Sequence, residues 1–435
     1  MSSRTEKFDV IVIGGGIMGS ATAYQTAQRD RKTLVLEQFG LVHRRGSSHG
    51  ESRTIQATHP NDYYSDMILE SSKLWRKAES EAGYKVRTRK HHLHMGPATD
   101  ARLQAVIASC RENYLRSNQK KETKNPFAFK ELNPREVADK FSGRLSIPEN
   151  WIAVLTKFGG VIEPTKAVLM FRELAVQMGA VWKDNMEVKH IEKRYKGRGG
   201  IVVRTAKGEE FRGKKCVVTA GAWTKKLVYS VNGQELPIQP METAVWYWRI
   251  KEGHEEKYAI GGDFPTFTSY GRPYIYGNSS LEFPGLIKIV EHGGWQCDPD
   301  KRPWMSGGDP DPLKEWIEGR FSGLLDCSTH ARKESCMYSM TPDGDFVLDF
   351  LGGEFRKDVV IGGGFSGHGF KMAPAIGRIL ADLALYGSAD GVELKPFRIG
   401  RFDENPKGNM KEFEEDDIDG RAESFIANFR RQNFG

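Results

Sequence analysis

The segment from residue 8 to residue 19 constrains the fold of this chain most. It reads FDVIVIGGGIMG, an apolar and β-branched run that leads into glycines. Such a run is typical of a parallel strand that is buried on both faces. Ile17, Ala21 and Tyr24 then recur at helical spacing, and a second apolar run, KTLVLE, follows at 32–37. Strand, helix and strand within about thirty residues predict one right-handed β-α-β unit.

The glycines at the end of the first strand match the GxGxxG pattern of dinucleotide-binding turns. Gly14 permits the tight turn, Gly16 lets the backbone approach a pyrophosphate, and Gly19 allows the helix to pack closely on the strand. Glu37 lies 18 residues after Gly19, where a carboxylate can accept hydrogen bonds from ribose hydroxyls. The pattern predicts nucleotide binding, but it does not distinguish FAD from NAD.

Further apolar strands recur far downstream, at 214–219 and 358–361, and a helix pattern follows at 373–385. The nucleotide-binding domain is therefore expected to be discontinuous, with residues 1–88, 157–232 and 336–400. Residues 89–156 and 233–335 are expected to form a substrate domain. Residues 240–350, most of which fall in this substrate domain, are rich in aromatic residues and turns. Such a composition is typical of antiparallel strands that wall an aromatic pocket. The fold class is thus α/β, a Rossmann-like domain plus an antiparallel-sheet domain.

Two polar stretches are expected to lie outside this framework. Residues 117–125, SNQKKETKN, have the composition of a solvated loop. From Asp403 the chain turns polar, with a strongly acidic run at 414–419. Residues 401–435 are therefore predicted to form a polar C-terminal tail that is surface-bound or partly disordered.

Composition excludes several classes of protein. The 64 basic and 57 acidic residues give a net charge of +7, but they are interspersed, so no nucleic-acid-binding stripe is expected. No apolar stretch approaches the ~18–20 residues of a membrane span. The N-terminus runs directly into the first strand and leaves no room for a secretory signal. The five cysteines show neither paired nor metal-like spacing, which suits free thiols in a reducing compartment and no metal site.

Four further segments carry a family resemblance. They are GSSHGESR at 46–53, GLIKIVEH at 285–292, CMYSMTPD at 336–343 and GGFSGHGFK at 363–371. In this order and spacing they resemble the monomeric sarcosine oxidase family, most closely its plant branch of sarcosine or pipecolate oxidases. The resemblance runs from about Phe8 to about Lys411. It implies an FAD enzyme that oxidises secondary amino acids, with a two-domain fold like that of D-amino acid oxidase.

The resemblance assigns roles to three residues beyond the glycine turn. Cys336 matches the cysteine that is bonded through sulfur to the flavin; a buried structural cysteine is the alternative. Lys288 matches a lysine that assists the reaction with oxygen, because a fixed ammonium stabilises the anion formed on electron transfer to O₂. A lysine is more commonly a solvated surface charge. His292, on the same face of the strand as Lys288, matches an active-site histidine, although a hydrogen-bonded core histidine is a serious alternative.

The loop after the second strand and the aromatic segments supply further candidates. By resemblance, His49 and Arg53 approach the flavin ring, where a guanidinium would stabilise the anionic reduced form; phosphate binding by Arg53 is the plain alternative. Tyr276 and Tyr338 match tyrosines that line the family's pocket, but ordinary core packing explains them nearly as well. The cofactor is also expected to contact three serines of this loop, Ser47, Ser48 and Ser52.

The glycine-rich loop near residue 367 completes the expected site. Gly367 and Gly369 permit close backbone approach to the flavin, and His368 is placed at the substrate. Lys371 matches the lysine that binds the substrate carboxylate beside the cofactor. The chain departs from the family pattern at Gln56, where a second basic residue is usual. Glutamine can hydrogen-bond a carboxylate but cannot form an ion pair with it.

The expected function is therefore an FAD-dependent oxidase of a secondary or cyclic amine, with O₂ as acceptor and hydrogen peroxide as product. A larger cyclic amine, held by apolar contact near Tyr276 and Trp246, is an alternative substrate. A catalytically weak flavin-binding protein and an NAD-dependent dehydrogenase are rival classes. A monomer is expected. The resemblance favours a peroxisomal enzyme and the cytoplasm is the alternative, since the sequence shows no SKL-type signal.

Overall fold

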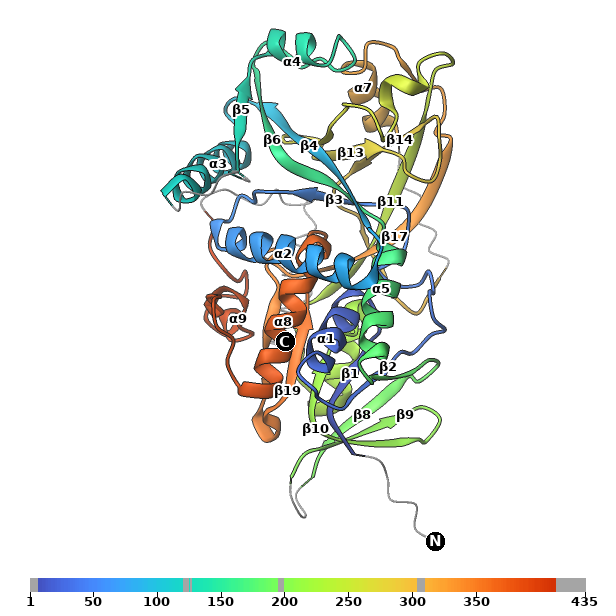
Figure 1. The fold of residues 1–435 in the computed structure, drawn as a ribbon, viewed down its shortest axis with the longest axis vertical. Helices are drawn as coiled ribbons and strands as arrows, with labels where there is room; N and C mark the ends of the chain where they lie inside the picture. Colours follow the sequence, from blue (N-terminus) through green and yellow to red (C-terminus); the bar gives the residue numbers. More distant parts are fainter. Residues whose placement is uncertain (1–6, 120–124, 126, 195–198, 303–309, 412–435) are drawn as a thin grey trace.

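The computed structural model describes residues 7–119, 125, 127–194, 199–302 and 310–411. Within this part of the chain the strands form two sheets, one of eight strands and one of eleven. The eight-stranded sheet occupies the lower half of the molecule in Figure 1, and the eleven-stranded sheet occupies the upper half. This two-sheet α/β architecture agrees with the expected fold class.

The first sheet is built on the predicted β-α-β unit. Its central strands β10, β1 and β2 run parallel to one another, as do the pairs β10–β19 and β2–β7. The apolar residues of β1 and β2 are buried on both sides, as the unbroken hydrophobic runs indicate. The sheet consists of β1 (Lys7–Ile13), β2 (Thr33–Leu36), β7 (Val181–Lys183), β8 (Val188–Lys193), β9 (Ile201–Thr205), β10 (Glu210–Val218), β18 (Val347–Gly352) and β19 (Arg356–Gly363).

The helix of the β-α-β unit, α1 (Ile17–Ala27), is buried along its whole length. Helices α5 (Pro164–Gln177) and α8 (Ala373–Tyr386) share one apolar core with it, and α2 (Ser65–Ala82) contributes to the same core. At Gly377 a Cβ atom would lie only 2.7 Å from the backbone carbon of Ala21. The absence of that side chain lets α8 pack closely against α1. The turn after β1 is therefore anchored on a rigid layer.

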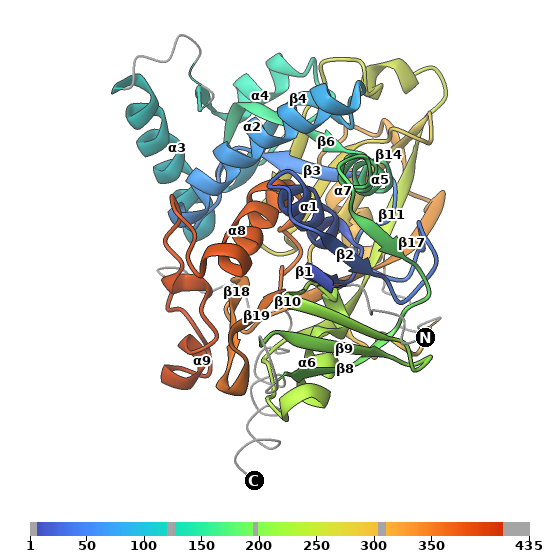
Figure 2. The ribbon, with the colours of Figure 1, turned by 60° about the horizontal axis from the view of Figure 1, so that its bottom comes forward.

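The second sheet curves over the first and is mainly antiparallel, as expected, although β4 and β12 pair in parallel. Its long strands β11 and β17 run down toward the nucleotide-binding half (Figure 2). The sheet consists of β3 (Arg53–Gln56), β4 (Arg87–Pro97), β5 (Phe129–Leu132), β6 (Trp151–Ile162), β11 (Gln239–Ile250), β12 (Thr266–Ser269), β13 (Ile275–Ser279), β14 (Leu286–Glu291), β15 (Trp295–Gln296), β16 (Leu325–Asp326) and β17 (Arg332–Met340).

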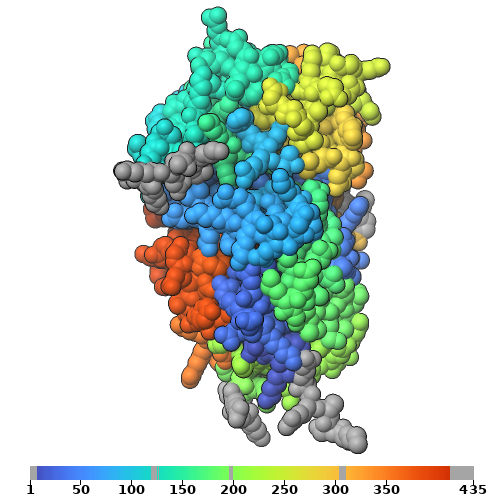
Figure 3. Space-filling model, in the orientation of Figure 1, coloured from blue at the N-terminus to red at the C-terminus, as the bar shows by residue number. Residues whose placement is uncertain are grey.

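The remaining helices lie around the two sheets. On the face shown in Figure 3, α2 covers the junction between the two halves. Among the described residues, no helix combines the length and apolar character that crossing a bilayer requires. The remaining α-helices and the 3-10 helices, labelled η, are α3 (Ala101–Gln119), α4 (Pro134–Lys140), α6 (Thr224–Asn232), α7 (Asp311–Glu318), α9 (Arg401–Glu404), η1 (Asp62–Tyr64), η2 (Gly221–Trp223), η3 (Glu255–Tyr258), η4 (Gly353–Phe355), η5 (Phe370–Met372) and η6 (Lys395–Phe397).

The sheet membership differs from the expected domain boundaries at four strands. β3, β4, β6 and β17 all belong to the second sheet. The expected boundaries had placed β3 and residues 87–88, 157–162 and 336–340 in the nucleotide-binding domain. The difference has a physical reason, because the chain crosses between the halves through strands rather than through loops. The division into two domains itself remains a prediction.

One polar segment was wrongly predicted, and a second is bound to the body of the protein. Ser117 is buried in the last turn of α3, which ends at Gln119, so the predicted loop at 117–125 begins in a helix. Residues 401–411 are in the bound one of the two expected states, because the buried Arg401 pairs with Asp343 through Nε at 2.7 Å. Lys411 likewise pairs with Asp345 at 2.6 Å. The acidic run at 414–419 lies outside the described residues.

Candidate functional site

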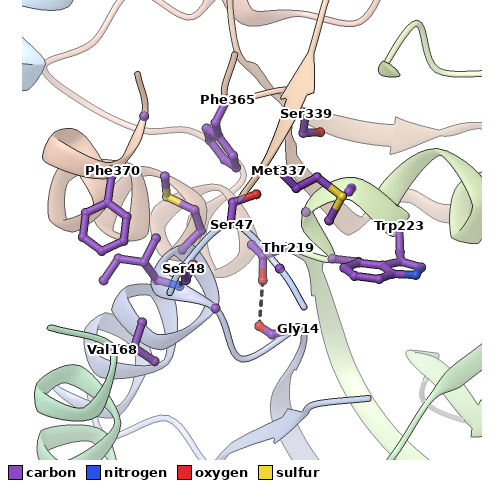
Figure 4. A pocket seen from close by; sticks show the side chains of 18 of the residues that line it. Gly14, Ser47, Ser48, Val168, Thr219, Trp223, Met337, Ser339, Phe365 and Phe370 are labelled. Carbon is purple, nitrogen blue, oxygen red and sulfur yellow. Dashed lines mark hydrogen bonds between the residues drawn. The ribbon is translucent and has the colours of Figure 1, made fainter. Parts of the chain in front are cut away.

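A cavity of about 530 Å³ runs from the turn after β1 to the aromatic wall of the second sheet. Residues from both sheets line it, so the site lies where the two halves meet. In Figure 4, Ser47 and Ser48 lie above the Gly14 turn, with Phe370 on one side and Trp223 on the other. Among the described residues, no group of three His, Cys, Asp or Glu side chains could hold a metal ion.

The glycine turn has the geometry that its sequence pattern predicts. Gly14 has φ +96°, and a Cβ atom there would lie 2.5 Å from the carbonyl oxygen of Thr219. A Cβ atom at Gly19 would lie 1.8 Å from the carbonyl oxygen of Gly14. Thr219 Oγ1 donates a hydrogen bond to that same oxygen at 3.1 Å (Figure 4). Side chains at these positions would disrupt the turn, whereas Gly16 leaves the backbone open to the cavity beside Ser48.

Glu37 lies at the end of β2, as expected, and lines the cavity. Its Oε2 accepts a hydrogen bond from the backbone N–H of Gly15 at 2.7 Å, and its Oε1 accepts one from Phe39 at 2.9 Å. His43 Nε2 lies 3.4 Å from Oε1. A carboxylate has about four acceptor positions, so Glu37 can fix the turn and still receive hydroxyl groups from a ligand. Ser48 Oγ accepts from the N–H of Ile17 at 3.1 Å, at the start of α1.

Cys336 and Arg53 face each other within the cavity. Cys336 lies on β17, is buried and lines the cavity, and its Sγ is 3.5 Å from Arg53 Nη2. The guanidinium also donates to the carbonyl oxygens of Ser47 at 2.8 Å, His49 at 2.6 Å and Ser52 at 2.8 Å. These bonds hold a permanent positive charge beside the thiol. Reactive cysteines are found in electropositive surroundings of this kind.

Lys288 is a buried cation at the wall of the cavity rather than a surface charge. It lies on β14, is 3% exposed, and its Nζ donates to the carbonyl oxygen of Ser52 at 2.9 Å. Burial and the neighbouring Arg53 lower the pKa of Lys288 to about 8, against an opposing effect of Glu51. At neutral pH the ammonium form therefore predominates, and its charge faces the cavity.

His292 follows β14 and lines the cavity, so it meets Lys288 at the same wall. Its ring centroid lies 5.4 Å from that of Tyr338 and 5.0 Å from that of Tyr274. Burial lowers the pKa of His292 to about 4, so the imidazole is neutral at physiological pH. A neutral imidazole can accept a hydrogen bond or a proton from a bound molecule.

The aromatic wall of the cavity is formed by tyrosines. The hydroxyl oxygens of Tyr276 and Tyr338 lie 3.2 Å apart, and burial raises the pKa of both phenols. Tyr274 also lines the cavity and was missed, although it lies in the same aromatic segment as Tyr276. Trp246 was wrongly predicted to line it: its ring is buried against His330, with the centroids 4.5 Å apart.

The glycine-rich loop brings a second cation to the cavity. Lys371, in η5, is 7% exposed and donates through Nζ to the carbonyl oxygen of His368 at 3.0 Å. Burial lowers the pKa of Lys371 to about 7. Gly367 has φ +75°, and a Cβ atom there would lie 2.9 Å from the ring of His292, so the loop approaches that wall closely. Gln56 lines the cavity from β3, and its Oε1 accepts from Thr268 at 3.5 Å.

The cavity lining includes the site residues that the sequence predicted except Gly19 and His49. Gly19 packs against the backbone of the turn, and the ring of His49 lies outside the lining. Its ring is buried, and its Nε2 has no hydrogen-bond partner among the described residues. Burial and the charge of Arg53 lower the pKa of His49 to about 3, so it stays neutral. Only its carbonyl oxygen contributes to the site, by accepting from Arg53 at 2.6 Å.

The shape and donor set of this cavity fit FAD. A Cβ atom at Gly14 or Gly19 would collide with the backbone of the turn, the carboxylate of Glu37 lines the cavity beside that turn, and a thiol and a guanidinium line it as well. The family model described as FAD dependent oxidoreductase matches residues 9–383. The chain therefore belongs to the family of FAD dependent oxidoreductases, which removes the NAD-dependent dehydrogenase as a rival.

Within this family the chain is related to the sarcosine oxidases. It is 56% identical to a probable sarcosine oxidase of Arabidopsis thaliana, over 94% of this chain and 95% of that protein. It is 33% identical to the human peroxisomal sarcosine oxidase, over 94% of this chain and all of that protein. It is 30% identical to the monomeric sarcosine oxidase of Bacillus sp. (strain B-0618), over 91% of this chain and 96% of that protein. These relationships define an FAD-dependent amine oxidase.

Solved structures agree on the fold. NikD, an amino acid oxidase of nikkomycin biosynthesis, matches with a TM-score of 0.74 at 22% identity, over 91% of this chain and 98% of that chain. The L-proline dehydrogenase of P. horikoshii matches with a TM-score of 0.73 at 23% identity, over 92% of this chain and 99% of that chain. At these identities the likeness concerns the architecture alone.

Proposed function

We propose that this amine oxidase acts on a secondary or cyclic amino acid such as sarcosine or pipecolate, carries its FAD on Cys336 and uses O₂ as electron acceptor. One observation carries the proposal: the thiol of Cys336 and the cations of Lys288 and Lys371 all line one cavity with the glycine turn. The proposal assigns the thiol to attachment of the flavin, Lys288 to the reaction with oxygen and Lys371 to the substrate carboxylate.

The nucleotide half of FAD would lie along the turn from Gly14 to Gly19, with Glu37 at its ribose. The serines Ser47 and Ser48 and the N–H groups at the start of α1 are available to its phosphates. When bound there, FAD would supply the acceptor for a hydride equivalent from the amine, which would become an imine, and O₂ would take up the two electrons together with two protons to give hydrogen peroxide. Arg53 supplies positive charge where negative charge would develop on reduction.

The substrate would be held by its carboxylate and by its apolar body. Lys371 offers a positive charge, and the amide nitrogen of Gln56 can donate a hydrogen bond. The tyrosine wall excludes water and favours the neutral amine. Neutral His292 can accept a hydrogen bond or a proton at that wall. Because Gln56 cannot pair as an ion, small amino acids should be held less tightly than larger cyclic amines.

Lys288 has the geometry for the oxygen step. Reduction of O₂ builds negative charge, and a preorganised ammonium in a water-poor site stabilises that charge without needing to reorganise. The two hydrogen bonds of Lys288 to Ser52 fix its position at the cavity wall. His49, which does not line the cavity, would serve only as part of the backbone that holds Arg53.

Two related points concern the protein in the cell. We place it in the peroxisome, because the human and mouse relatives are named peroxisomal sarcosine oxidases; the cytoplasm is the alternative. We propose a monomer, since the relative from Bacillus is named monomeric. A catalytically weak flavin-binding protein is the second candidate function, and it is disfavoured by the joint presence of Cys336, Lys288 and Lys371 in one cavity.

A peroxide-coupled screen tests the proposed function. The purified protein is mixed with sarcosine, pipecolate, proline analogues and alkaloid-like cyclic amines, and hydrogen peroxide is followed with a peroxidase dye. Turnover of secondary amino acids is expected, whereas turnover only of cyclic amines without a carboxylate would favour the larger-amine alternative. If a yellow, folded protein forms no peroxide with any of these amines, the oxidase assignment is wrong.

A further inference from the structure

A buried carboxylate lies behind the cavity and has no role in the chemistry described so far. Glu51 is 2% exposed and does not line the cavity. It accepts hydrogen bonds from Ser52 Oγ at 2.6 Å and from Ser280 Oγ at 3.0 Å, and also from the backbone N–H groups of Leu281 and Glu282. All four partners donate to its two oxygens, so the pocket holds the carboxylate as a hydrogen-bond acceptor.

The hydroxyl group of Ser52 connects this carboxylate to Lys288. A hydroxyl has one hydrogen to donate and two lone pairs. The hydrogen goes to Glu51 Oε2, the nearest acceptor, at 2.6 Å. The lone pairs of Ser52 Oγ then accept from Lys288 Nζ at 3.3 Å and from Asn278 Nδ2 at 3.2 Å. Every bonding position of Ser52 Oγ is thus used, and its orientation is fixed by Glu51.

This arrangement also fixes the direction of the ammonium group. An ammonium has three N–H donors. In Lys288 one of them goes to the carbonyl oxygen of Ser52 at 2.9 Å and a second to Ser52 Oγ at 3.3 Å. The third is left for the cavity, which Lys288 lines. Glu51 therefore acts on the cavity through Ser52 without touching it.

We propose that Glu51 is a positioning residue for Lys288: through Ser52 it directs the ammonium group into the cavity, and it places a buried carboxylate behind that group as a counter-charge. The inference rests on the proposed function, in which the charge of Lys288 stabilises reduced oxygen. It adds a residue that touches neither the substrate nor the flavin. Loss of Glu51 should therefore weaken the oxygen step while leaving the substrate groups in place.

The charges around Lys288 decide the direction of the expected effect. Burial and then Arg53 lower its pKa to about 8, whereas Glu51, Cys336 and Glu334 act to raise it. The phenols of Tyr276 and Tyr247 also face it, and burial raises the pKa of each, so both stay neutral. Among the carboxylates, Glu51 has the larger effect on Lys288, and it alone is bonded to Ser52. Removing its charge must lower the pKa of Lys288 further.

The test uses the flavin absorbance of the resting holoprotein, titrated from neutral to alkaline pH without substrate. Lys288 lies beside the proposed flavin site, so its loss of charge should give a spectral step near pH 8. E51Q should move this step down by about one pH unit or more, as is usual for the loss of a nearby opposite charge. E334Q is the matched control, because Glu334 is a carboxylate bonded to Arg332 and Tyr247 and not to Ser52; its shift should be smaller.

K288M separates the inference from the proposed function. If K288M abolishes the step and E51Q leaves it at the native pH, the role of Glu51 is wrong and the proposed function stands. If K288M leaves both the step and the reoxidation rate unchanged, the proposed role of Lys288 is wrong, and the role of Glu51 with it.

E51Q places an amide among four donors and can impair folding, so E51D and S52A are measured as well. E51D keeps the charge but withdraws it from Ser52, and S52A removes the bridging hydroxyl. Both variants should lower the pH of the spectral step by less than E51Q does. Both should also slow reoxidation of the flavin relative to its reduction. Native titration curves in both variants would also overturn the inference.

Discussion

Arg53 Nη2 lies 3.5 Å from the sulfur of Cys336, although the two residues are 283 positions apart in the sequence. β3 carries the arginine and β17 carries the cysteine, and the guanidinium is held there by three backbone carbonyl groups. A fixed positive charge beside the sulfur is a feature of reactive cysteine sites. This pairing is the strongest structural support for a covalent bond between the protein and its flavin.

Replacing Cys336 by serine should therefore release the flavin. The native protein is denatured in acid, the precipitate is collected, and the flavin absorbance of the pellet and the supernatant is compared. Colour should stay with the native pellet and move to the supernatant in Cys336→Ser. Cys297→Ser is the matched control, because Cys297 is a free thiol outside the cavity. Yellow supernatant from the native protein would refute the covalent bond.

Lys288→Met should affect the two half-reactions differently. Loss of one preorganised charge at a developing anion costs about 10²–10³ in rate, so reoxidation by O₂ should slow by that factor while reduction by substrate changes little. Stopped-flow absorbance times the two steps separately. Lys371→Met, which removes the other buried cation of the cavity, should instead weaken substrate binding. Equal slowing of both half-reactions in Lys288→Met would assign Lys288 to structure or to substrate binding.

Sequence reasoning was most reliable where a local pattern dictates local geometry. Gly14, Gly16, Gly19 and Glu37 lie as predicted because the turn tolerates no side chain and the second strand ends at the cavity. The association of Cys336, Lys288 and Lys371 could be expected only from the family resemblance, because no spacing along the chain reveals that distant segments meet.

Contacts between distant segments account for the differences from expectation. His49 was placed at the flavin by family resemblance and Trp246 in the aromatic wall, but the ring of Trp246 is buried against His330 and the ring of His49 lies outside the cavity lining. The segment 401–411 reads as polar and was expected to be surface-bound or partly disordered. It is fixed by buried ion pairs to Asp343 and Asp345, which lie far away along the chain and which composition cannot reveal.

Those ion pairs make a prediction about stability. Arg401 and Asp343 are almost fully buried, and Arg401→Met would leave the carboxylate of Asp343 without its cation. Breaking a buried pair in this way typically costs about 3–5 kcal/mol in the free energy of unfolding, which urea denaturation followed by circular dichroism can measure. Arg135→Met, which breaks the exposed pair with Asp139, should leave the midpoint near the native value. Equal stability of both variants would mean that residues 401–411 contribute little to the fold.

Gln56 determines the expected preference among substrates. It lines the cavity together with Lys371 where the family places a second base, and a neutral hydrogen bond replaces a charged one there. Gln56→Arg should regain roughly 1–2 kcal/mol of carboxylate binding, or about ten-fold in the KM for sarcosine. Larger cyclic amines should change less, because apolar contact with the tyrosine wall holds them.

Gln56→Leu serves as the control for that substitution, since it removes the hydrogen bond without adding charge, and it should raise the KM for sarcosine. Steady-state peroxide formation gives both constants. Micromolar KM for sarcosine in the natural sequence, unaffected by Gln56→Arg, would show that another base already fills this place.

Anaerobic reduction of the purified protein tests the central claim most directly. Sarcosine or pipecolate is added without oxygen while the flavin absorbance is followed, and oxygen is then admitted with peroxide measured. We predict that a secondary amino acid bleaches the flavin completely, and that oxygen restores the colour with one hydrogen peroxide per flavin. A flavin that no secondary amine bleaches, or that stays reduced in air, would contradict an FAD-dependent amine oxidase that uses O₂.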